Sequence, residues 1–288
     1  MIAQTYKNWE LIFWDNLSTD NSKKVFLEFS DYRFKYFVSD QHTTLSEARN
    51  KAIQQSKGKI IAFLDTDDWW DKNKLEKQIS HFKDQEVGLV HSNFYLFYEN
   101  NNKKKIWHKK NIRSGYITKN LCKNYNIGLV STLISKKAYL SVQGFNNFYT
   151  IISDFDLFMR LSQKWKFIYV AEKLAFFRIH NENFTLLNSE MEINELEKWI
   201  HDAQNKTNEI LDPYLHYVVR RLNFLKTKKY IKDGNITKAI KNIILLPIGF
   251  NKVRLILRIL LPMGFNKIKL ILRIFLPKVI VKRVQYYQ

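Results

Sequence analysis

Short apolar runs alternate with amphipathic segments along the first third of the chain. Their spacing predicts strand, helix, strand, helix, strand and helix, in the order 9–14, 18–29, 33–38, 44–56, 59–64 and 72–83. In the first helix Val25, Phe26 and Phe29 share one face, and Gly58 is placed to end the second helix. This alternation predicts a parallel sheet covered by helices, with ligand chemistry at the carboxyl ends of the strands.

The pattern changes twice further along the chain. After Val87 it becomes strand-rich, with aromatic runs at 93–98 and 129–135 and a helix at about 154–164. From about Leu186 to Lys232 the apolar spacing is helical and strand signals disappear. We therefore predict an α/β fold followed by a helical extension, in three parts: 1–185, 186–240 and 241–288.

Composition narrows the class of protein. With 288 residues, 45% of them hydrophobic, the chain can bury one large core, which excludes disorder throughout. The single Cys122 can form neither an internal disulfide nor a cysteine zinc site, so a reducing compartment such as the cytoplasm fits. The first residues do not resemble a signal peptide, and no run of about 18 uncharged apolar residues predicts a spanning helix.

The net charge of +20 is concentrated at one end of the chain. Residues 241–288 contain ten Lys or Arg and no Asp or Glu. In the same segment, residues 245–259 recur at 260–274 with three substitutions. The charge therefore belongs to a tail, and the absence of stacking aromatics or a nucleic-acid motif argues against nucleic acid as partner.

An acidic turn is the strongest local signal for chemistry. Asp65, Asp67 and Asp68 follow the apolar run at 59–64, and three carboxylates this close repel one another unless a cation or solvent compensates. Oxygen ligands of this kind suit Mg²⁺ or Mn²⁺, which bridges to a diphosphate. From spacing alone, an acidic turn that caps the next helix is an equal alternative.

Three further groups are weaker by themselves. Asp154 and Asp156 begin a helix, where an N-cap is the simpler interpretation. Arg178 and His180 alternate along a strand, and an exposed pair of this kind needs no function. Arg49 and Asn50, within a helix, indicate nothing alone.

Taken in order, four stretches resemble the family 2 glycosyltransferases, a large inverting group with a GT-A fold. They are AQTYKNWELIFWDNLSTDNS (3–22), LSEARNKAIQQSKGKIIAFLDTDDWWDKNKLEKQI (45–79), GFNNFYTIISDFDLFMRL (144–161) and LAFFRIHNENFT (174–185). The resemblance covers roughly residues 1–185 and implies a mixed sheet flanked by helices.

The resemblance also implies roles for single residues. Asp65 and Asp67 match the DXD motif, which holds Mn²⁺ or Mg²⁺ on the phosphates of a donor, here a UDP-sugar. Asp154 matches the catalytic base of the family's Glu-Asp pair, although Ser153 replaces the glutamate. Asp15 and Asn16 match the family's contacts to the nucleotide base and ribose. Arg49 matches a position near the diphosphate. Arg178 and His180 match an Arg-x-His segment at the diphosphate and acceptor side.

The implied reaction is a single displacement. Asp154 would remove the proton of an acceptor hydroxyl on a glycan or lipid-linked acceptor while that oxygen attacks the anomeric carbon. Charge that develops on the departing nucleotide would be stabilised beside Asp65 and Asp67. Inversion of configuration follows.

One departure from the family concerns the first residues. Family members usually begin with an apolar strand, a loop and a helix, and Met1 falls where that helix should end. We therefore expect a missing interior strand, exposed apolar neighbours and fewer donor contacts. An inactive relic of the fold, acting as a membrane- or partner-binding module, is the alternative.

The tail predicts a contact with membranes. In its repeats, basic residues such as Arg254 and Arg258 share one helical face beside apolar residues, and prolines interrupt the pattern. Short basic amphipathic helices suit an anionic bilayer surface, so we expect residues 241–288 to hold the protein on the inner face of the cell membrane. Packing of these helices on the body or on another chain is the alternative.

Overall fold

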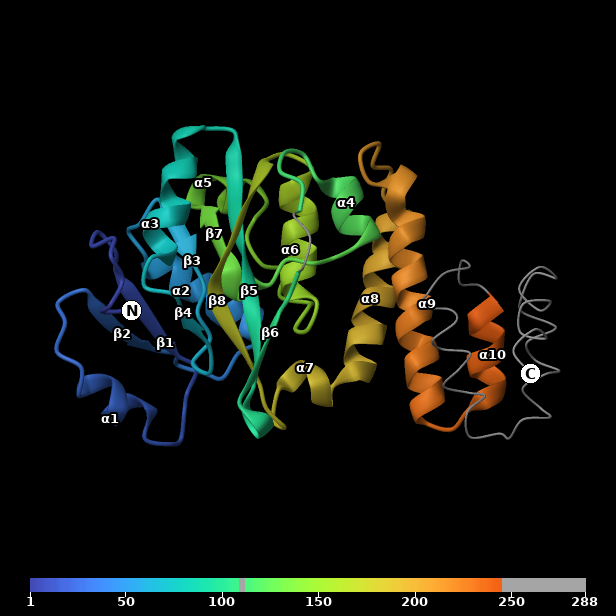
Figure 1. The fold of residues 1–288 in the computed structure, drawn as a ribbon, viewed down its shortest axis with the longest axis horizontal. Helices are drawn as coiled ribbons and strands as arrows, with labels where there is room; N and C mark the ends of the chain where they lie inside the picture. The colour runs from blue at the N-terminus through green and yellow to red at the C-terminus, as the bar shows by residue number, and fades with distance from the viewer. Residues whose placement is uncertain (109–111, 245–288) are drawn as a thin grey trace, which may run out of the picture. The chain divides into compact units, whose positions relative to one another are not determined.

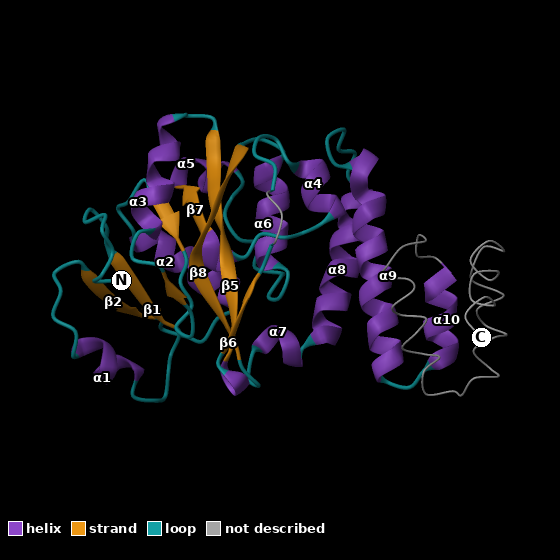
Figure 2. Cartoon of the chain, viewed as in Figure 1, coloured by secondary structure: helices purple, strands orange, loops and turns teal. Residues whose placement is uncertain are grey.

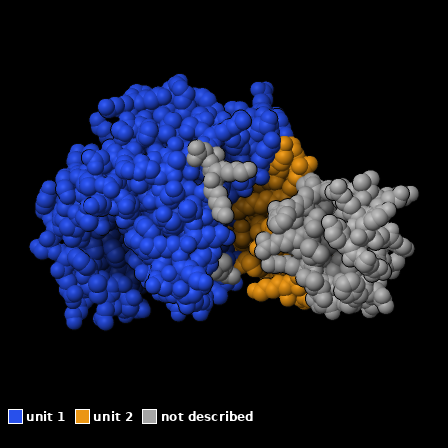
Figure 3. Space-filling view, viewed as in Figure 1, with its two compact units in different colours: residues 1–188, 203–214 blue, residues 189–202, 215–288 orange. Residues whose placement is uncertain are grey.

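The computed structural model describes residues 1–108 and 112–244, which divide into two compact units (Figure 3). Met1–Asn188 and Ala203–Tyr214 form the first unit, and Ser189–Asp202 with the chain from Leu215 onward forms the second. The tandem repeat at 245–274 lies outside the described residues, as does the rest of the chain after it.

The first unit begins with a small parallel sheet (Figure 1). Strand β1 (Leu11–Asp15) pairs with β2 (Phe34–Val38), and α1 (Ser22–Leu27) connects them. Phe26 of α1 packs against Phe13 and Tyr36, with ring centroids 4.9 and 5.4 Å apart. Within the described residues, the other edge of β1 has no strand partner.

The predicted apolar face of α1 is only partly correct. Val25 and Phe29 are 51% and 55% exposed; Phe26 packs closely on the sheet, and the half-exposed Phe29 ring lies 6.3 Å from that of Phe34. The helix has six residues, and Phe29 lies beyond its end at Leu27. Because Phe29 lies outside the helix, helical spacing does not place it on the same face as Val25.

The main sheet is mixed (Figure 2). Its strand order is β3-β7-β5-β8-β4, with β6 beside β5, and β5 and β8 run parallel while the other pairs are antiparallel. The bounds are β3 (Ile60–Ala62), β4 (Trp69–Trp70), β5 (Val87–Tyr98), β6 (Lys103–Ile106), β7 (Thr132–Ser135) and β8 (Lys166–Ile179). The mixed sheet flanked by helices confirms the predicted fold class, although strand alternation alone had predicted a parallel sheet.

Helices and short 3-10 turns surround this sheet. They are α2 (Leu45–Gln55), α3 (Lys74–Ile79), α4 (Thr118–Lys123), α5 (Lys136–Ser141), α6 (Ser153–Ser162), α7 (Phe184–Leu187), and the turns Ser80–Lys83, Glu99–Asn101, Leu129–Ser131 and Asp212–Tyr214. Helix α6 lies deepest, because Phe155, Leu157, Phe158, Met159 and Leu161 are all at most 1% exposed. Burial of that much apolar surface fixes the start of α6 relative to the sheet.

Gly58 does not end α2 in the predicted way. The helix is capped at its start by Thr44, whose side chain accepts from the Glu47 amide, and it ends at Ser56 in an extended conformation. The backbone of Gly58 is not left-handed. Its amide donates to Glu10 Oε1 at 2.9 Å, and the Lys57 amide donates to the same oxygen. The Glu10 carboxylate therefore ties the residue before β1 to the segment that enters β3.

The second unit is helical, as predicted. It contains most of α8 (Ser189–Gln204), together with α9 (Leu215–Lys232) and α10 (Ile236–Ile244). Ion pairs join α8 to α9, namely Glu190–Lys229 at 2.9 Å, Glu192–Arg221 at 3.1 Å and Glu197–Lys226. Among the described helices none has the length and apolarity needed to cross a bilayer.

Candidate active site

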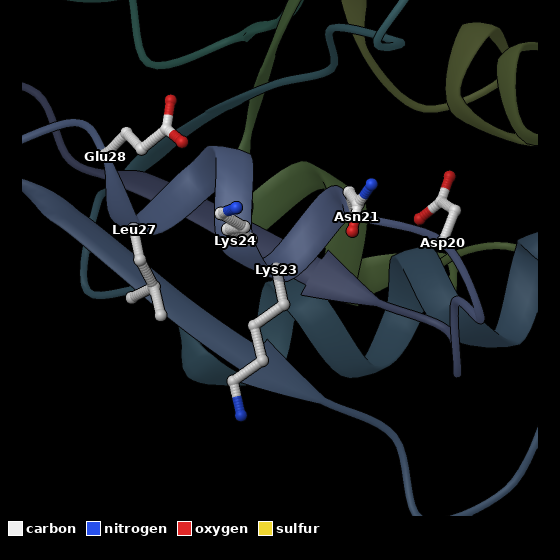
Figure 4. Close-up of a pocket in the computed structure, with 6 residues that line it drawn as sticks. All are labelled: Asp20, Asn21, Lys23, Lys24, Leu27 and Glu28. Carbon is white, nitrogen blue, oxygen red and sulfur yellow. The ribbon is translucent and has the colours of Figure 1, made fainter.

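A cavity of about 480 Å³ beside α1 contains none of the predicted site residues (Figure 4). Its side chains come from the helix and from the residues on either side of it, and they do not converge on one point: Asp20, Asn21, Lys23, Lys24, Leu27 and Glu28. A ligand site usually needs convergent polar groups. The chemistry must therefore be sought at the acidic turn.

The acidic turn begins at Asp65, three positions after β3 ends at Ala62. The Asp68 amide donates to the Asp65 carbonyl at 3.1 Å, which closes the turn. The side chains of Asp65 and Asp67 are 49% and 37% exposed, whereas Asp68 is buried. Two carboxylates are thus accessible and one is withdrawn into the protein.

Each of the three carboxylates meets a group from another element. Arg49 Nη2 of α2 lies 3.0 Å from Asp65 Oδ1, and His180 Nε2 lies 3.0 Å from Asp67 Oδ2. The backbone amide of Arg178, near the end of β8, donates to Asp68 Oδ1 at 2.9 Å. The structure therefore brings Asp65, Asp67, Arg49, Arg178 and His180 together, although they span 132 positions of the sequence.

Asp68 has the most perturbed carboxyl in this turn. Burial raises its pKa to about 7, the amide of Arg178 opposes that shift, and the neighbouring Asp67 and Asp65 charges add to it. Its Oδ2 has no hydrogen-bond partner in the described structure. A carboxyl that is partly protonated near neutral pH reduces repulsion within the turn.

Arg178 is held over the turn by contacts on both sides. Its guanidinium lies 5.7 Å from the Trp69 ring and 3.4 Å from Glu99 Oε1. Sequence reasoning did not single out Trp69 or Glu99. Trp69 adjoins the acidic turn in sequence, but nothing local marks Glu99, because its partner is 79 residues away.

Helix α2 connects the acidic turn to the loop before α6. Asn50 Nδ2 donates to the Phe145 carbonyl at 2.9 Å, and Asn50 Oδ1 accepts from the Phe145 amide at 3.0 Å and from the Tyr139 hydroxyl. Phe145 also lies edge-on to Phe63, 5.3 Å away, in the segment that leads to Asp65. Arg49 and Asn50, uninformative in the sequence, thus fix two parts of one site.

The same loop is fastened at two more points. Ser46 Oγ donates to the Tyr149 carbonyl at 2.6 Å, and Arg160 Nη2 donates to the Gly144 carbonyl at 2.8 Å while Arg160 Nε pairs with Asp156 at 3.0 Å. Gly144 has a left-handed backbone, and a Cβ there would lie 2.7 Å from the Tyr139 ring. Glycine is required at this position.

Asp154 lies in the first turn of α6 and is half-buried. Its Oδ1 accepts from the Phe155 amide at 2.7 Å. Ile152 occupies the N-cap position, so Asp154 is not the capping residue, although a negative charge in the first turn suits the helix dipole. Its role as catalytic base stays a prediction.

Asp15 and Asn16 lie at the carboxyl end of β1. Asp15 is buried and accepts from the Ser18 amide at 2.7 Å and from the Tyr36 hydroxyl. Burial raises the pKa of its carboxyl, but these hydrogen bonds outweigh burial, so the pKa lies below the ordinary aspartate value. Asn16 exchanges hydrogen bonds with Thr43, beside the cap of α2. No hydrogen bond joins either described side chain to the acidic turn, and their contact with a nucleotide stays a prediction.

The acidic turn fits a divalent cation that is shared with a phosphate. Within residues 1–108 and 112–244, no three His, Cys, Asp or Glu side chains group to hold a metal alone. Mg²⁺ and similar ions often take one or two carboxylates and complete their shell with phosphate and water. Asp65 and Asp67 are exposed and supply such ligands, so the donor set suits this arrangement.

Comparisons with known proteins agree with this geometry. Residues 1–135 match the family model described as glycosyl transferase family 2. The Escherichia coli UDP-Glc:alpha-D-GlcNAc-diphosphoundecaprenol beta-1,3-glucosyltransferase WfgD is 36% identical over 137 residues, which cover 47% of this chain and 52% of that protein. The putative teichuronic acid biosynthesis glycosyltransferase TuaG of Bacillus subtilis is 31% identical over 98 residues, covering 33% and 39%. The matched part thus spans about half or less of these relatives.

Solved structures share the fold. S. aureus TarS 1–349 in complex with UDP-GlcNAc has a TM-score of 0.64 at 14% identity, over 90% of this chain and 80% of that one. The mannosyltransferase PcManGT from Pyrobaculum calidifontis, in complex with GDP-Man and Mn²⁺, has a TM-score of 0.58 at 13% identity, over 94% and 72%. The fold is that of the GT-A glycosyltransferases. With the family match and the curated relatives, residues 1–135 of this chain are similar to glycosyl transferase family 2.

Proposed function

We propose that this protein transfers a sugar from a nucleotide-diphosphate donor, a UDP-sugar, to a hydroxyl of a growing surface glycan or glycolipid, with inversion. The observation that carries the proposal is the network in which Asp65 and Asp67 meet Arg49 and His180 from distant elements. Carboxylates beside a guanidinium and an imidazole suit a diphosphate bound together with Mg²⁺ or Mn²⁺.

The names of relatives and neighbours support the substrate class. WfgD is named for a UDP-glucose donor and an acceptor linked to diphosphoundecaprenol, and TarS was solved with UDP-GlcNAc. These names describe those proteins. They support a UDP-sugar and a lipid-linked acceptor as the first substrates to test here.

Each residue of the site contributes to the proposed reaction. Asp65 and Asp67 would hold a divalent cation, which would supply positive charge beside the leaving diphosphate. Arg49 and Arg178 stabilise the same charge, and Asp15 and Asn16 orient the nucleoside. Asp154 accepts the proton of the acceptor hydroxyl as its oxygen attacks the anomeric carbon from the face opposite the leaving group.

The proposal also assigns the parts of the chain. Residues 1–185 form the catalytic domain, 186–240 a helical extension, and 241–288 a basic segment that attaches the enzyme to the anionic inner face of the cell membrane. Cosedimentation with vesicles containing phosphatidylglycerol measures the proposed membrane attachment. Deletion of 241–288 should abolish binding, and unchanged sedimentation would exclude attachment by this segment.

Nucleotide release tests the proposed activity. The full chain is incubated with Mn²⁺, a panel of nucleotide sugars and undecaprenyl-diphosphate-linked GlcNAc, and released nucleoside diphosphate is measured. Acceptor-dependent release from one donor is expected. Titration calorimetry with UDP and Mn²⁺ gives a second measurement, in which Asp67→Asn should weaken Mn²⁺-dependent binding at least tenfold; no metal-dependent binding by the unmodified chain would contradict the proposal.

A further inference from the structure

A second cavity, of about 320 Å³, lies next to the acidic turn. It is lined by residues from the turn after β5 and from the end of β8: Tyr98, Asn100, Asn101, Ile179, His180 and Asn181. His180 also pairs with Asp67 at 3.0 Å, so one side chain belongs to both the cavity and the network described above. The two sites are therefore neighbours.

The main sheet sets the position of this cavity. Strands β5 and β8 are parallel, and Tyr98 is paired directly with Ile179 at their carboxyl ends. The turn Glu99–Asn101 follows, and the left-handed backbone of Asn102 completes it. Glu99 is joined to Arg178 at 3.4 Å, and Asn100 Nδ2 donates to Asn181 Oδ1 at 3.3 Å. The turn is thus fastened to β8 on two sides.

The chemistry of the lining selects a neutral polyol. No Lys, Arg, Asp or Glu lines the cavity, so its lining carries no permanent charge that attracts a phosphate or a carboxylate. Asn100, Asn101 and Asn181 bring amides, which both donate to and accept from hydroxyl groups, and Tyr98 brings an aromatic ring. Amides beside an aromatic ring suit the hydroxyls and the apolar face of a sugar.

The size of the cavity limits the occupant. Small-molecule sites typically have volumes of roughly 300–1,000 Å³, so a cavity of about 320 Å³ lies at the lower end. One sugar unit suits this volume better than a long glycan does.

We propose that this cavity binds one uncharged sugar unit of the acceptor, next to the site of transfer. The proposal rests on the proposed function, which it extends by specifying the acceptor end of the site. Through His180, the cavity is joined to the carboxylate pair proposed to hold the donor. A bound acceptor sugar would thus lie beside the donor phosphates.

Kinetics of paired variants test the subsite. With undecaprenyl-diphosphate-linked GlcNAc as acceptor, the double variant Asn101→Ala/Asn181→Ala should raise the KM for acceptor about tenfold, because it removes hydrogen bonds to hydroxyls. The KM for the UDP-sugar should change less than twofold. Asn124→Ala, an exposed asparagine at the end of α4, is the matched control and should alter neither value.

Binding without turnover separates this proposal from the proposed function. Saturation-transfer NMR with methyl glycosides of glucose and GlcNAc should show contact with the unmodified chain and loss of the signal in the double variant, while Tyr98→Phe, which keeps the ring, retains it. An unchanged acceptor KM together with an unchanged NMR signal would overturn the subsite and leave the transfer reaction standing. NMR contact that the unmodified chain shows and the double variant loses, in a protein that transfers no sugar, would support the subsite and contradict the proposed function.

Discussion

Three aspartates within four consecutive positions have different environments, and this difference decides their chemistry. Asp65 and Asp67 are accessible and paired with Arg49 and His180, while Asp68 is buried with a pKa of about 7. Accessible carboxylates can bind a cation. The buried one instead fixes the backbone of Arg178 by accepting its amide.

Asp154 provides the sharpest test at the scale of one residue. Asp154→Asn keeps the shape of the side chain but removes the proton acceptor, so we expect kcat to fall by about 10²–10⁴-fold with little change in UDP binding. Initial rates of nucleotide release and calorimetry with UDP measure the two quantities. Asp233→Asn, at an exposed position in the second unit, is the control; equal rates for the Asp154 and Asp233 variants would exclude Asp154 as the base.

Lys74 is a buried cation outside the site. Its Nζ donates to the Thr132 carbonyl at 3.2 Å and lies 4.4 Å from the Trp70 ring, and complete burial lowers its pKa well below the ordinary lysine value. The folded state therefore binds fewer protons than the unfolded state, so this residue opposes folding at neutral pH. Lys74→Met should raise the free energy of unfolding by about 1 kcal/mol or more in urea denaturation at pH 7. A less stable variant would show that the hydrogen bond outweighs the cost of neutralising the amine.

At the scale of elements, α2 joins the acidic turn to the loop before α6. Asn50→Ala removes the side chain that binds both the amide and the carbonyl of Phe145. Because these groups then lose their partner, we expect a loss of about 2 kcal/mol in the free energy of unfolding. Urea denaturation measures it, and Asn124→Ala, with an exposed side chain, should cost less than about 0.5 kcal/mol. Equal losses for the two variants would show that α2 does not fasten the loop.

The sequence predicted elements better than it predicted contacts. Periodicity placed the early strands and helices, because local spacing carries that information, and the acidic turn was visible since its members are adjacent. The partners of Arg49 and Asn50 could not be derived, because Phe145 lies 95 residues from Asn50 and only the folded core brings them together. Gly58 failed as a helix terminator for the same reason, since a distant carboxylate, that of Glu10, takes its amide.

At the scale of the whole molecule, buried histidine makes the fold sensitive to acid. His91 on β5 is fully buried, and burial, together with the charge of His108, lowers its pKa from 6.5 to about 3. The unfolded chain takes up a proton at this residue below about pH 6.5 while the folded chain does not, so stability falls as the pH drops from 6.5 toward 3. Urea denaturation at pH 7 and pH 5 measures the fall. His91→Leu should reduce it, and an unchanged pH dependence would assign the acid sensitivity to other groups.

The open edges of the two sheets have a consequence for handling the protein. Strand β1 pairs only with β2 and β3 pairs only with β7 in the described structure, so each leaves a row of backbone amides and carbonyls without a strand beside it. Such edges recruit extended peptide from other molecules. Concentrated solutions should therefore self-associate through intermolecular β-pairing, with light scattering that rises steeply with protein concentration, and a short synthetic peptide of alternating valine and threonine should compete for the same edges.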